Sequence, residues 1–479
     1  MPVPFLIAIL LLLGAVLLRS RASSSRSVTG ILKVAIPIAG LLWLGMEIGR
    51  GVSTGSETLW RNDGITRTAL VLAGLVPLIL GLLESSSGLL SALFWSCGLL
   101  GLSAVSALPA VQWVSLILSV APILFYGRTE SGPREGILSR HPTLIFGSGL
   151  FSIGFFVFMA VHPEHPAATI ALVLVLCGMG GMLGWFPFPR TVPYPGTPAS
   201  FTLIFAHRIL PCLIAGVLLF RLVERQLLTD YQSLLLLLAG MFSLAISSAR
   251  LLKEERFSRR LVLCGCSTLS FLVLTVHFRH WEITHSSQIW SVTSNLPSAS
   301  SLFASILACE TMALLAITCG FRLLQRELTE ECFVQPLSGI AVRCPGMALP
   351  AVCGLYSMAG LPPFPGFWWR FGLFSICLMP HRQSNVTHVM ELDRTFALIT
   401  ICLTFVFLVN MLAHVQMIQR MFLDDPFRVR EGRPSRMVQL AAAASLLLLL
   451  LLSWIPLSVG PVLEHTRPVV VDESPVESF

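Results

Sequence analysis

The sequence predicts an all-α membrane protein that crosses the bilayer many times. Of its 479 residues, 54% are hydrophobic and only 12% are charged, whereas a soluble domain carries a charged fraction of about 25%. Long apolar runs recur along the whole chain, and a helix needs about twenty such residues to cross the hydrocarbon layer. Proline and glycine interrupt two of these runs, which predicts two broken helices.

Dividing the apolar runs by this length predicts about fourteen transmembrane helices. The candidates are residues 3–18, 31–49, 66–83, 87–106, 109–126, 143–161, 167–187, 199–223, 231–249, 260–278, 300–323, 347–379, 394–421 and 437–460. Loops that follow odd-numbered spans carry most of the basic charge, as in residues 252–260. The positive-inside rule places these loops in the cytoplasm or the mitochondrial matrix, and both termini on the other side.

The predicted helices form four consecutive segments. Residues 1–108 contain helices 1–4, residues 109–223 a first half-channel region, residues 231–421 a second half-channel region that includes the broken helix at 347–379, and residues 422–479 the last helix with an acidic tail.

A short repeat relates the two half-channel regions. G-W-F-P-F-P in span 7 returns as G-L-P-P-F-P in span 12, five spans later, so the two copies run in opposite directions. Paired interrupted helices at corresponding places are typical of inverted-repeat transporters. We therefore expect two inverted five-helix repeats with broken helices 7 and 12. The break residues are Gly184, Pro187, Pro189, Gly360, Pro362, Pro363, Pro365 and Gly366.

Ionisable side chains inside apolar spans are the candidate polar pathway, because a charge at membrane depth needs a partner or a water-filled cavity. These are Arg208 beside His207, Glu310 and Arg370. We expect Glu310 to pair with one of the arginines, either as a structural salt bridge or as part of the pathway. Arginine keeps its proton. His207 could carry protons or hydrogen-bond a neighbouring helix. Glu84, at a helix end, is a further pathway candidate or a capping residue.

Other chemistries lack a signal in this sequence. The twelve cysteines are scattered through apolar runs without metal-ligand spacing, and no dinucleotide or phosphate-binding motif occurs. We expect no metal site and no redox cofactor on this chain. His277, His280 and His285 predict an interfacial loop rather than a metal site. The basic residues are dispersed among loops, which argues against nucleic acid as a partner.

Residues 357–371, S-M-A-G-L-P-P-F-P-G-F-W-W-R-F, resemble the S-L-A-G-[IL]-P-P-x-x-G-F-x-x-K-[FW] signature of one antiporter-like subunit of respiratory complex I. This is subunit 2 of the mitochondrial NADH–ubiquinone oxidoreductase, the N subunit of bacteria. Leu337, Gly339, Arg343 and Pro345 match the L-x-G-x-x-x-R-x-P that precedes the signature. The match is specific over about forty residues around this helix.

The resemblance implies a membrane-arm subunit of a proton-translocating NADH:ubiquinone reductase, with protons moving along a midplane row of charged residues. NADH, FMN, iron–sulfur clusters and ubiquinone would be bound by partner subunits. The neighbours would be other antiporter-like subunits and membrane lipids. The location would be the mitochondrial inner membrane or, alternatively, a bacterial plasma membrane.

Four positions depart from the family. Arg208 and Arg370 stand where the family has lysines of spans 8 and 12, while Met182 and Leu116 stand where it has the lysine of span 7 and the glutamate of span 5. These departures leave open whether the subunit itself conducts protons. The alternatives are a subunit of a multisubunit cation/proton antiporter and a structural membrane-arm subunit that does not conduct.

Overall fold

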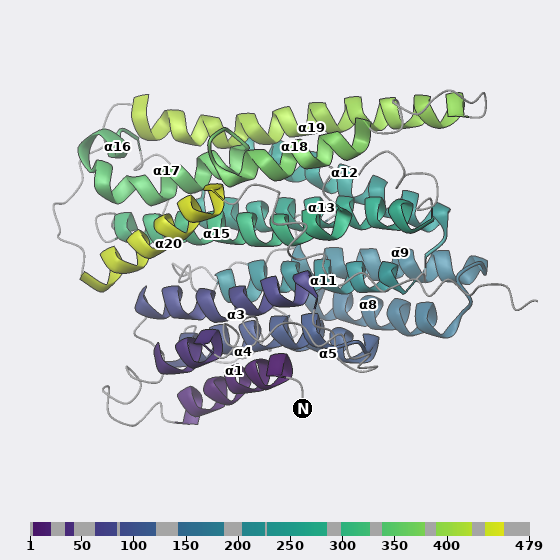
Figure 1. Cartoon of the computed structure of the whole chain (residues 1–479), viewed down its shortest axis with the longest axis horizontal. Helices are drawn as coiled ribbons and strands as arrows, with labels where there is room; N and C mark the ends of the chain where they lie inside the picture. The colour runs from purple at the N-terminus through teal and green to yellow at the C-terminus, as the bar shows by residue number, and fades with distance from the viewer. Residues whose placement is uncertain are drawn as a thin grey trace, which may run out of the picture.

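The computed structural model describes residues 3–20, 34–42, 63–83, 87–120, 142–185, 204–225, 228–284, 298–325, 338–378, 389–423 and 436–454. Glu84, Pro187, Pro189 and His285 lie outside these ranges. The regular structure of the described segments is helical, and the helices lie roughly side by side (Figure 1). The all-α prediction is confirmed. The division into four segments stays a prediction.

The helices of the first half are α1 (Val3–Ser20), α3 (Gly64–Leu83), α4 (Ser87–Val105), α5 (Pro109–Val120), α8 (Pro142–Ala160), α9 (Pro166–Leu183), and a π-helical turn, η1 (Phe205–Ile209), that continues into α11 (Leu210–Glu224). The second half contains α12 (Asp230–Lys253), α13 (Phe257–Thr284), α15 (Ala299–Gln325), α16 (Ile340–Arg343), α17 (Pro345–Ala359), α18 (Pro365–Leu378), α19 (Val389–Leu423) and α20 (Arg436–Trp454). A further helical stretch covers residues 34–42. Each predicted span therefore contains a helix.

Seven helical segments of the described chain are long and apolar enough to cross a membrane: Gly64–Leu83, Pro166–Leu183, Phe205–Glu224, Asp230–Lys253, Arg259–Thr284, Ala299–Leu323 and Leu398–Leu423. Shorter apolar helices accompany them, among them Leu6–Val16 and Leu90–Val105. The protein is thus a multi-pass membrane protein.

Contacts between helix ends show that the two interrupted helices run in opposite directions. The side-chain Nε2 of Gln232 at the start of α12 donates to the Pro163 carbonyl just before α9, at 2.9 Å. The amide of Ala299 at the start of α15 donates to Glu282 near the end of α13, at 3.3 Å. Hence α9, α12 and α15 start at one end of the bundle, and α17, which follows α15, starts at the other. This antiparallel pair fits the predicted inverted repeat.

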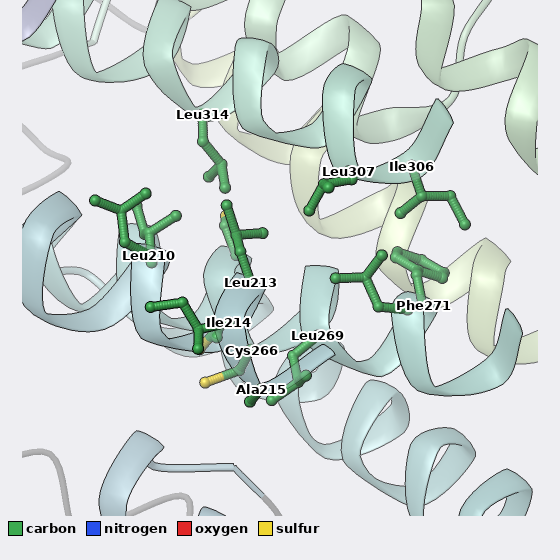
Figure 2. Packing of buried hydrophobic residues seen from close by; sticks show 14 of the residues in the cluster. Leu210, Leu213, Ile214, Ala215, Cys266, Leu269, Phe271, Ile306, Leu307 and Leu314 are labelled. Carbon is green, nitrogen blue, oxygen red and sulfur yellow. The ribbon is translucent and has the colours of Figure 1, made fainter. Parts of the chain in front are cut away.

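The centre of the core lies where α11, α13 and α15 meet, and the apolar windows of α11 and α13 are completely buried. Figure 2 shows the interdigitating side chains, which include Leu210, Leu213, Ile214, Ala215, Cys266, Leu269, Phe271, Ile306, Leu307 and Leu314. In a membrane an apolar helix can face lipid or be buried in protein, and the full burial of the apolar part of α13 shows that other helices enclose it. The polar groups of α13 are therefore held inside the protein.

An ion cluster joins α3 and α11 at the end of the bundle where α12 begins. Arg221 donates to both carboxylate oxygens of Asp63, at 2.5 and 2.8 Å, and to Glu224 at 2.7 Å. Asp63 also accepts from the Thr66 amide at 2.8 Å, which caps α3. Burial tends to raise the pKa of Asp63, but the charge and hydrogen bonds of Arg221 hold that pKa well below its usual value. The geometry is that of a structural ion pair.

The prediction of a histidine-rich loop is wrong for His277 and His280, the two of its histidines that the structure describes. Because α13 continues to Thr284, His277 and His280 lie on its last turns. His277 Nδ1 is 2.8 Å from the Ser233 hydroxyl, and His280 Nε2 is 3.0 Å from Asp230. Both histidines thus bind α12, and these polar contacts stabilise a helix that extends beyond its apolar run.

Candidate functional site

The candidate site lies at the break in the second interrupted helix, which the structure confirms. Helix α17 ends at Ala359, and Gly360 follows with φ of 73°. The amides of Gly360 and Leu361 donate back to Ser357 and Tyr356, at 3.0 and 3.2 Å, which is a Schellman ending that needs glycine at the left-handed position. Helix α18 begins at Pro365. The break is therefore built into the sequence.

Arg370 fills this break. Its Nη1 donates to the carbonyls of Ser357 and Gly366, at 2.9 and 3.1 Å, and its Nη2 donates to the Met358 carbonyl. Within a continuous helix, the Met358 carbonyl would accept from residue 362, but Pro362 has no amide hydrogen. The guanidinium supplies that missing donor. A cation also suits the C-terminal end of a helix dipole.

Close packing holds the guanidinium in place. Its carbon lies 4.3 Å from the centre of the Trp369 ring and 5.2 Å from that of Phe271. A Cβ on Gly360 would lie 2.6 Å from Arg370 Cδ, and a Cβ on Gly366 would lie 1.8 Å from the Ser357 oxygen. The glycines of the motif are thus required by the close approach of α17, α18 and this arginine.

Glu310 is the carboxylate that faces Arg370. It lies in the middle of α15 with 1% of its surface exposed. One carboxylate oxygen is 3.4 Å from Arg370 Nη2 and the other is 3.4 Å from the Thr268 hydroxyl. Both contacts are long and single, unlike the two-pronged Arg221–Asp63 pair. The charge of Glu310 is consequently only partly compensated by its neighbours.

The first interrupted helix has a matching arrangement. Helix α9 ends at Leu183, and Gly184 follows with φ of 74° and donates to the Gly180 carbonyl at 2.9 Å. Arg208 Nη1 donates to the Met182 carbonyl at 2.8 Å. Met182 precedes Gly184 by two residues, as Met358 precedes Gly360. In each repeat a buried arginine therefore donates to the equivalent backbone carbonyl, that of Met182 or of Met358. The two arginines themselves come from different positions in the repeat.

The repeat is longer than the proline motif alone. Cys177 and Gly178 correspond to Cys353 and Gly354 at the same spacing from the break. A Cβ on Gly178 would lie 2.3 Å from the Phe151 amide nitrogen of α8, and one on Gly354 would lie 2.7 Å from a backbone oxygen of α15. Both helices thus pack closely on the helix that precedes them in the repeat. This extended identity was a signal that the sequence interpretation missed.

His207 and Arg208 lie together in the π-helical turn η1, where the Leu210 amide donates to Phe205. Pro211 cannot donate to the His207 carbonyl, which explains the irregular turn. Both side chains are buried, and His207 contacts the backbone of Ser119 in α5. Within the described chain, the structure places no carboxylate at ion-pair distance from Arg208. Of the two partners expected for Glu310, only Arg370 pairs with it.

The first half-channel lacks ionisable groups at the family positions. Leu116 and Met182 are fully buried in the apolar core. The neighbouring hydroxyls of Ser115 and Ser119 donate to the backbone of their own helix, at 2.8 and 2.7 Å. The side chains that the structure describes here offer no carboxylate–lysine pair.

A polar seam between α13 and α19 was not predicted. It consists of Arg260, Cys264 and Thr268 on α13 and of Asn410 and His414 on α19, all of them buried. The sequence predicts a basic loop at residues 252–260, but α13 begins at Phe257 and Arg260 is buried against α12 and α19. The overlooked signals were the four-residue spacing on α13 and the N-x-x-x-H pattern in an apolar run.

Comparison with known proteins supports the motif resemblance, although no family model matches the chain. NADH-quinone oxidoreductase subunit N of Polaromonas naphthalenivorans is 26% identical over 268 residues, which cover 55% of this chain and 49% of that protein. The subunit N of Nitrosomonas europaea is 26% identical over 301 residues, 61% of this chain and 58% of that protein. The matched part of the chain thus spans about half the length of these curated relatives.

Solved structures share the fold over nearly the whole chain. A chain of respiratory complex I from Thermus thermophilus has a TM-score of 0.68 at 18% identity, covering 95% of this chain and 99% of that one. The archaeal membrane-bound sulfane sulfur reductase gives 0.69 at 13% identity, covering 96% of both chains. The Mrp complex from Dietzia sp. DQ12-45-1b gives 0.65 at 13%, covering 96% of this chain and 95% of that one.

The fold is therefore that of a class of membrane chains that occurs in respiratory complex I and in these two other complexes. Within this class, the curated relatives are subunit N of NADH-quinone oxidoreductase, so the resemblance predicted from residues 357–371 is confirmed.

Proposed function

We propose that this chain is the membrane-arm, antiporter-like subunit N of an NADH-quinone oxidoreductase and that it takes part in proton translocation coupled to quinone reduction. The observation that carries the proposal is the α17–α18 break, where Arg370 and Glu310 meet inside an apolar bundle. Such a pair at an interrupted helix is typical of ion paths rather than of lipid-facing spans. The relatives of the chain supply the identity of the complex.

In this proposal the cofactors and the quinone are bound by partner subunits. Neighbouring antiporter-like subunits and membrane lipids cover the outer faces of the bundle. This chain contributes a fixed positive charge, Arg370, and a group that can gain and lose a proton, Glu310. A charge change in a neighbouring subunit would alter the free-energy difference between the two forms of Glu310, since electrostatic effects are large in a low-dielectric interior. Arg370 stays charged throughout.

Proton exchange is confined to the second half of the chain in this proposal, because Leu116 and Met182 replace the ionisable groups of the first half. Arg208 supports the end of α9 and places a second fixed charge at the centre of the bundle. The curated relatives named above are bacterial, which favours a bacterial plasma membrane over the mitochondrial inner membrane. The basic loops would then face the cytoplasm.

A cation/proton antiporter subunit is the second candidate, favoured by the similarity to the Mrp complex. A non-conducting structural subunit is the third. The loosely paired carboxylate argues against the third candidate, because a purely structural pair would gain from the compact two-pronged geometry seen at Arg221.

Deletion of the gene tests the proposal. The native membranes should lose a large assembly that oxidises NADH within a native gel, and expression of the chain should restore it. A deletion strain that retains this assembly at full size and activity would refute membership in the complex.

A further inference from the structure

We propose that Glu310 exchanges its proton with the basic end of the bundle through His414, along the seam that Arg260, Cys264, Thr268, Asn410 and His414 form between α13 and α19. This inference rests on the proposed function and names the route that serves it. It uses residues outside the motif that relates this chain to its relatives.

The seam is a row of polar groups that begins beside Glu310. On α13, Arg260, Cys264 and Thr268 are four residues apart and therefore lie on one face of the helix. The Thr268 hydroxyl is 3.4 Å from Glu310 and donates to the Cys264 carbonyl at 3.0 Å. The Cys264 thiol lies 3.6 Å from His414 Nε2. The line connects the middle of α15 to the outer end of α13 over two helical turns, about 12 Å.

The hydrogen bonds of His414 define its role. Nδ1 is 2.8 Å from the Asn410 carbonyl, which can only accept, so Nδ1 carries the hydrogen. In the neutral ring, Nε2 is then the proton acceptor, and it faces Cys264. The Asn410 side chain donates to the Ser248 hydroxyl of α12 at 3.0 Å, which fixes this part of α19. The ring is thus held with its basic nitrogen directed into the seam.

The charges around the seam make His414 a transient rather than a resting position for a proton. His414 lies within electrostatic range of both Arg260 and Arg370. A proton on His414 is therefore repelled from both sides. The groups that face Glu310 are Arg370 and Trp369 of α18 and Thr268 of α13.

At the inner end of the seam, Glu310 supplies the carboxylate that accepts the proton. In the transfer step, the Nε2–H bond of the imidazolium breaks and an O–H bond forms on the Glu310 carboxylate. The ring returns to neutral, and the Cys264 thiol and then the Thr268 hydroxyl pass the proton on, each breaking its own S–H or O–H bond as it takes up the incoming proton.

Arg260 marks the outer end of the route. Its guanidinium is buried, with Nη1 3.0 Å from the Met417 sulfur and Nη2 on the Leu251 carbonyl. These contacts hold α19 and the end of α12 against the start of α13. No carboxylate of the described chain pairs with Arg260 within 4 Å. Its charge therefore acts on Cys264 and His414 in the seam and is only partly offset by Glu254.

The test measures protons pumped per NADH oxidised in inverted membrane vesicles that contain the intact complex. Glu310→Gln, His414→Gln and the double variant should lower this ratio by the same amount, because residues on one route are not additive. Glu310→Asp should recover part of the loss. His277→Gln is the matched control, since His277 is also a buried histidine that is hydrogen-bonded to a neighbouring helix, yet lies outside the seam. Its ratio should equal that of the unsubstituted complex.

An unchanged ratio in His414→Gln, in a complex of normal abundance and NADH oxidation, would overturn the route. If that variant does not assemble, Thr268→Val decides the matter, because it removes the bridging hydroxyl without unpairing a charge. A normal ratio there equally contradicts the route. Loss of the chain from any NADH-oxidising assembly would instead refute the proposed function, so the two failures are distinguishable.

Discussion

Replacing Arg370 by methionine should destabilise the subunit severely. Methionine leaves the Met358 carbonyl without a donor, which costs about 1–3 kcal/mol for a buried group. The bonds to Ser357 and Gly366 contribute about 1 kcal/mol each. Their loss costs less because a backbone amide of the helix can still donate to each of these two carbonyls. The expected sum is about 3–5 kcal/mol before any effect on Glu310. That is a large fraction of the roughly 5–15 kcal/mol by which folded domains are stable.

Glu310 adds to this cost if it remains charged, because breaking a buried ion pair by removing one partner costs about 3–5 kcal/mol. A carboxylate that can take up a proton avoids most of this penalty. The double variant Arg370→Met/Glu310→Gln should therefore regain stability relative to Arg370→Met, and the size of the regain measures how charged Glu310 is in the single variant. It follows that Glu310→Gln probes proton transfer better than any substitution of Arg370.

The assay is the abundance of the subunit in membranes, together with the thermal midpoint of the solubilised complex. Arg259→Met is the matched control: Arg259 is 46% exposed and lies 3.9 Å from Glu254, so its loss should cost at most about 1 kcal/mol. Equal abundance and equal midpoints for Arg370→Met and Arg259→Met would refute the argument that Arg370 supports the break.

Three further predictions follow from single positions. Gly366→Ala should abolish accumulation of the subunit because its Cβ would overlap a backbone oxygen, whereas Gly149→Ala in α8, whose Cβ meets nothing within 4 Å, should be tolerated in the same immunoblot. Arg221→Met should lower the thermal midpoint. The pKa of Asp63 is depressed in the folded state. The stability that the Arg221–Asp63 pair contributes should therefore be present above the usual aspartate pKa of about 3.9 and be lost as the pH falls below that value. A difference in midpoint between Arg221→Met and the unsubstituted protein that grows on acidification would contradict this. A Glu255→Cys variant should react with a membrane-impermeant maleimide only from the cytoplasmic side, and labelling of intact cells would reverse the topology.

Much of the fold follows from the sequence because two physical signals are strong. Apolar length defines the spans, and Pro362 together with Gly360 defines where a helix has to end. The longer repeat that includes Gly178 and Gly354 was equally readable, since both glycines mark close helix contacts.

The site was less predictable because its partners are distant in sequence. A buried arginine predicts a charged partner, but the sequence does not show that Arg370 donates most of its hydrogen bonds to backbone carbonyls. His414 is a single histidine in an apolar run, and its contact with Cys264 becomes apparent only when α13 is seen to pack against α19. Arg260 resembled a loop residue because the start of α13 is charged, and only tertiary contacts with Leu251 and Met417 bury it.

The most direct test of the account is to purify the tagged chain from solubilised membranes of its own organism and to measure NADH:quinone reduction in the assembly that elutes with it. The account predicts a large assembly in which this activity is proportional to the amount of the chain. A chain that elutes in an assembly without NADH oxidation, such as one that only exchanges cations for protons, would contradict it.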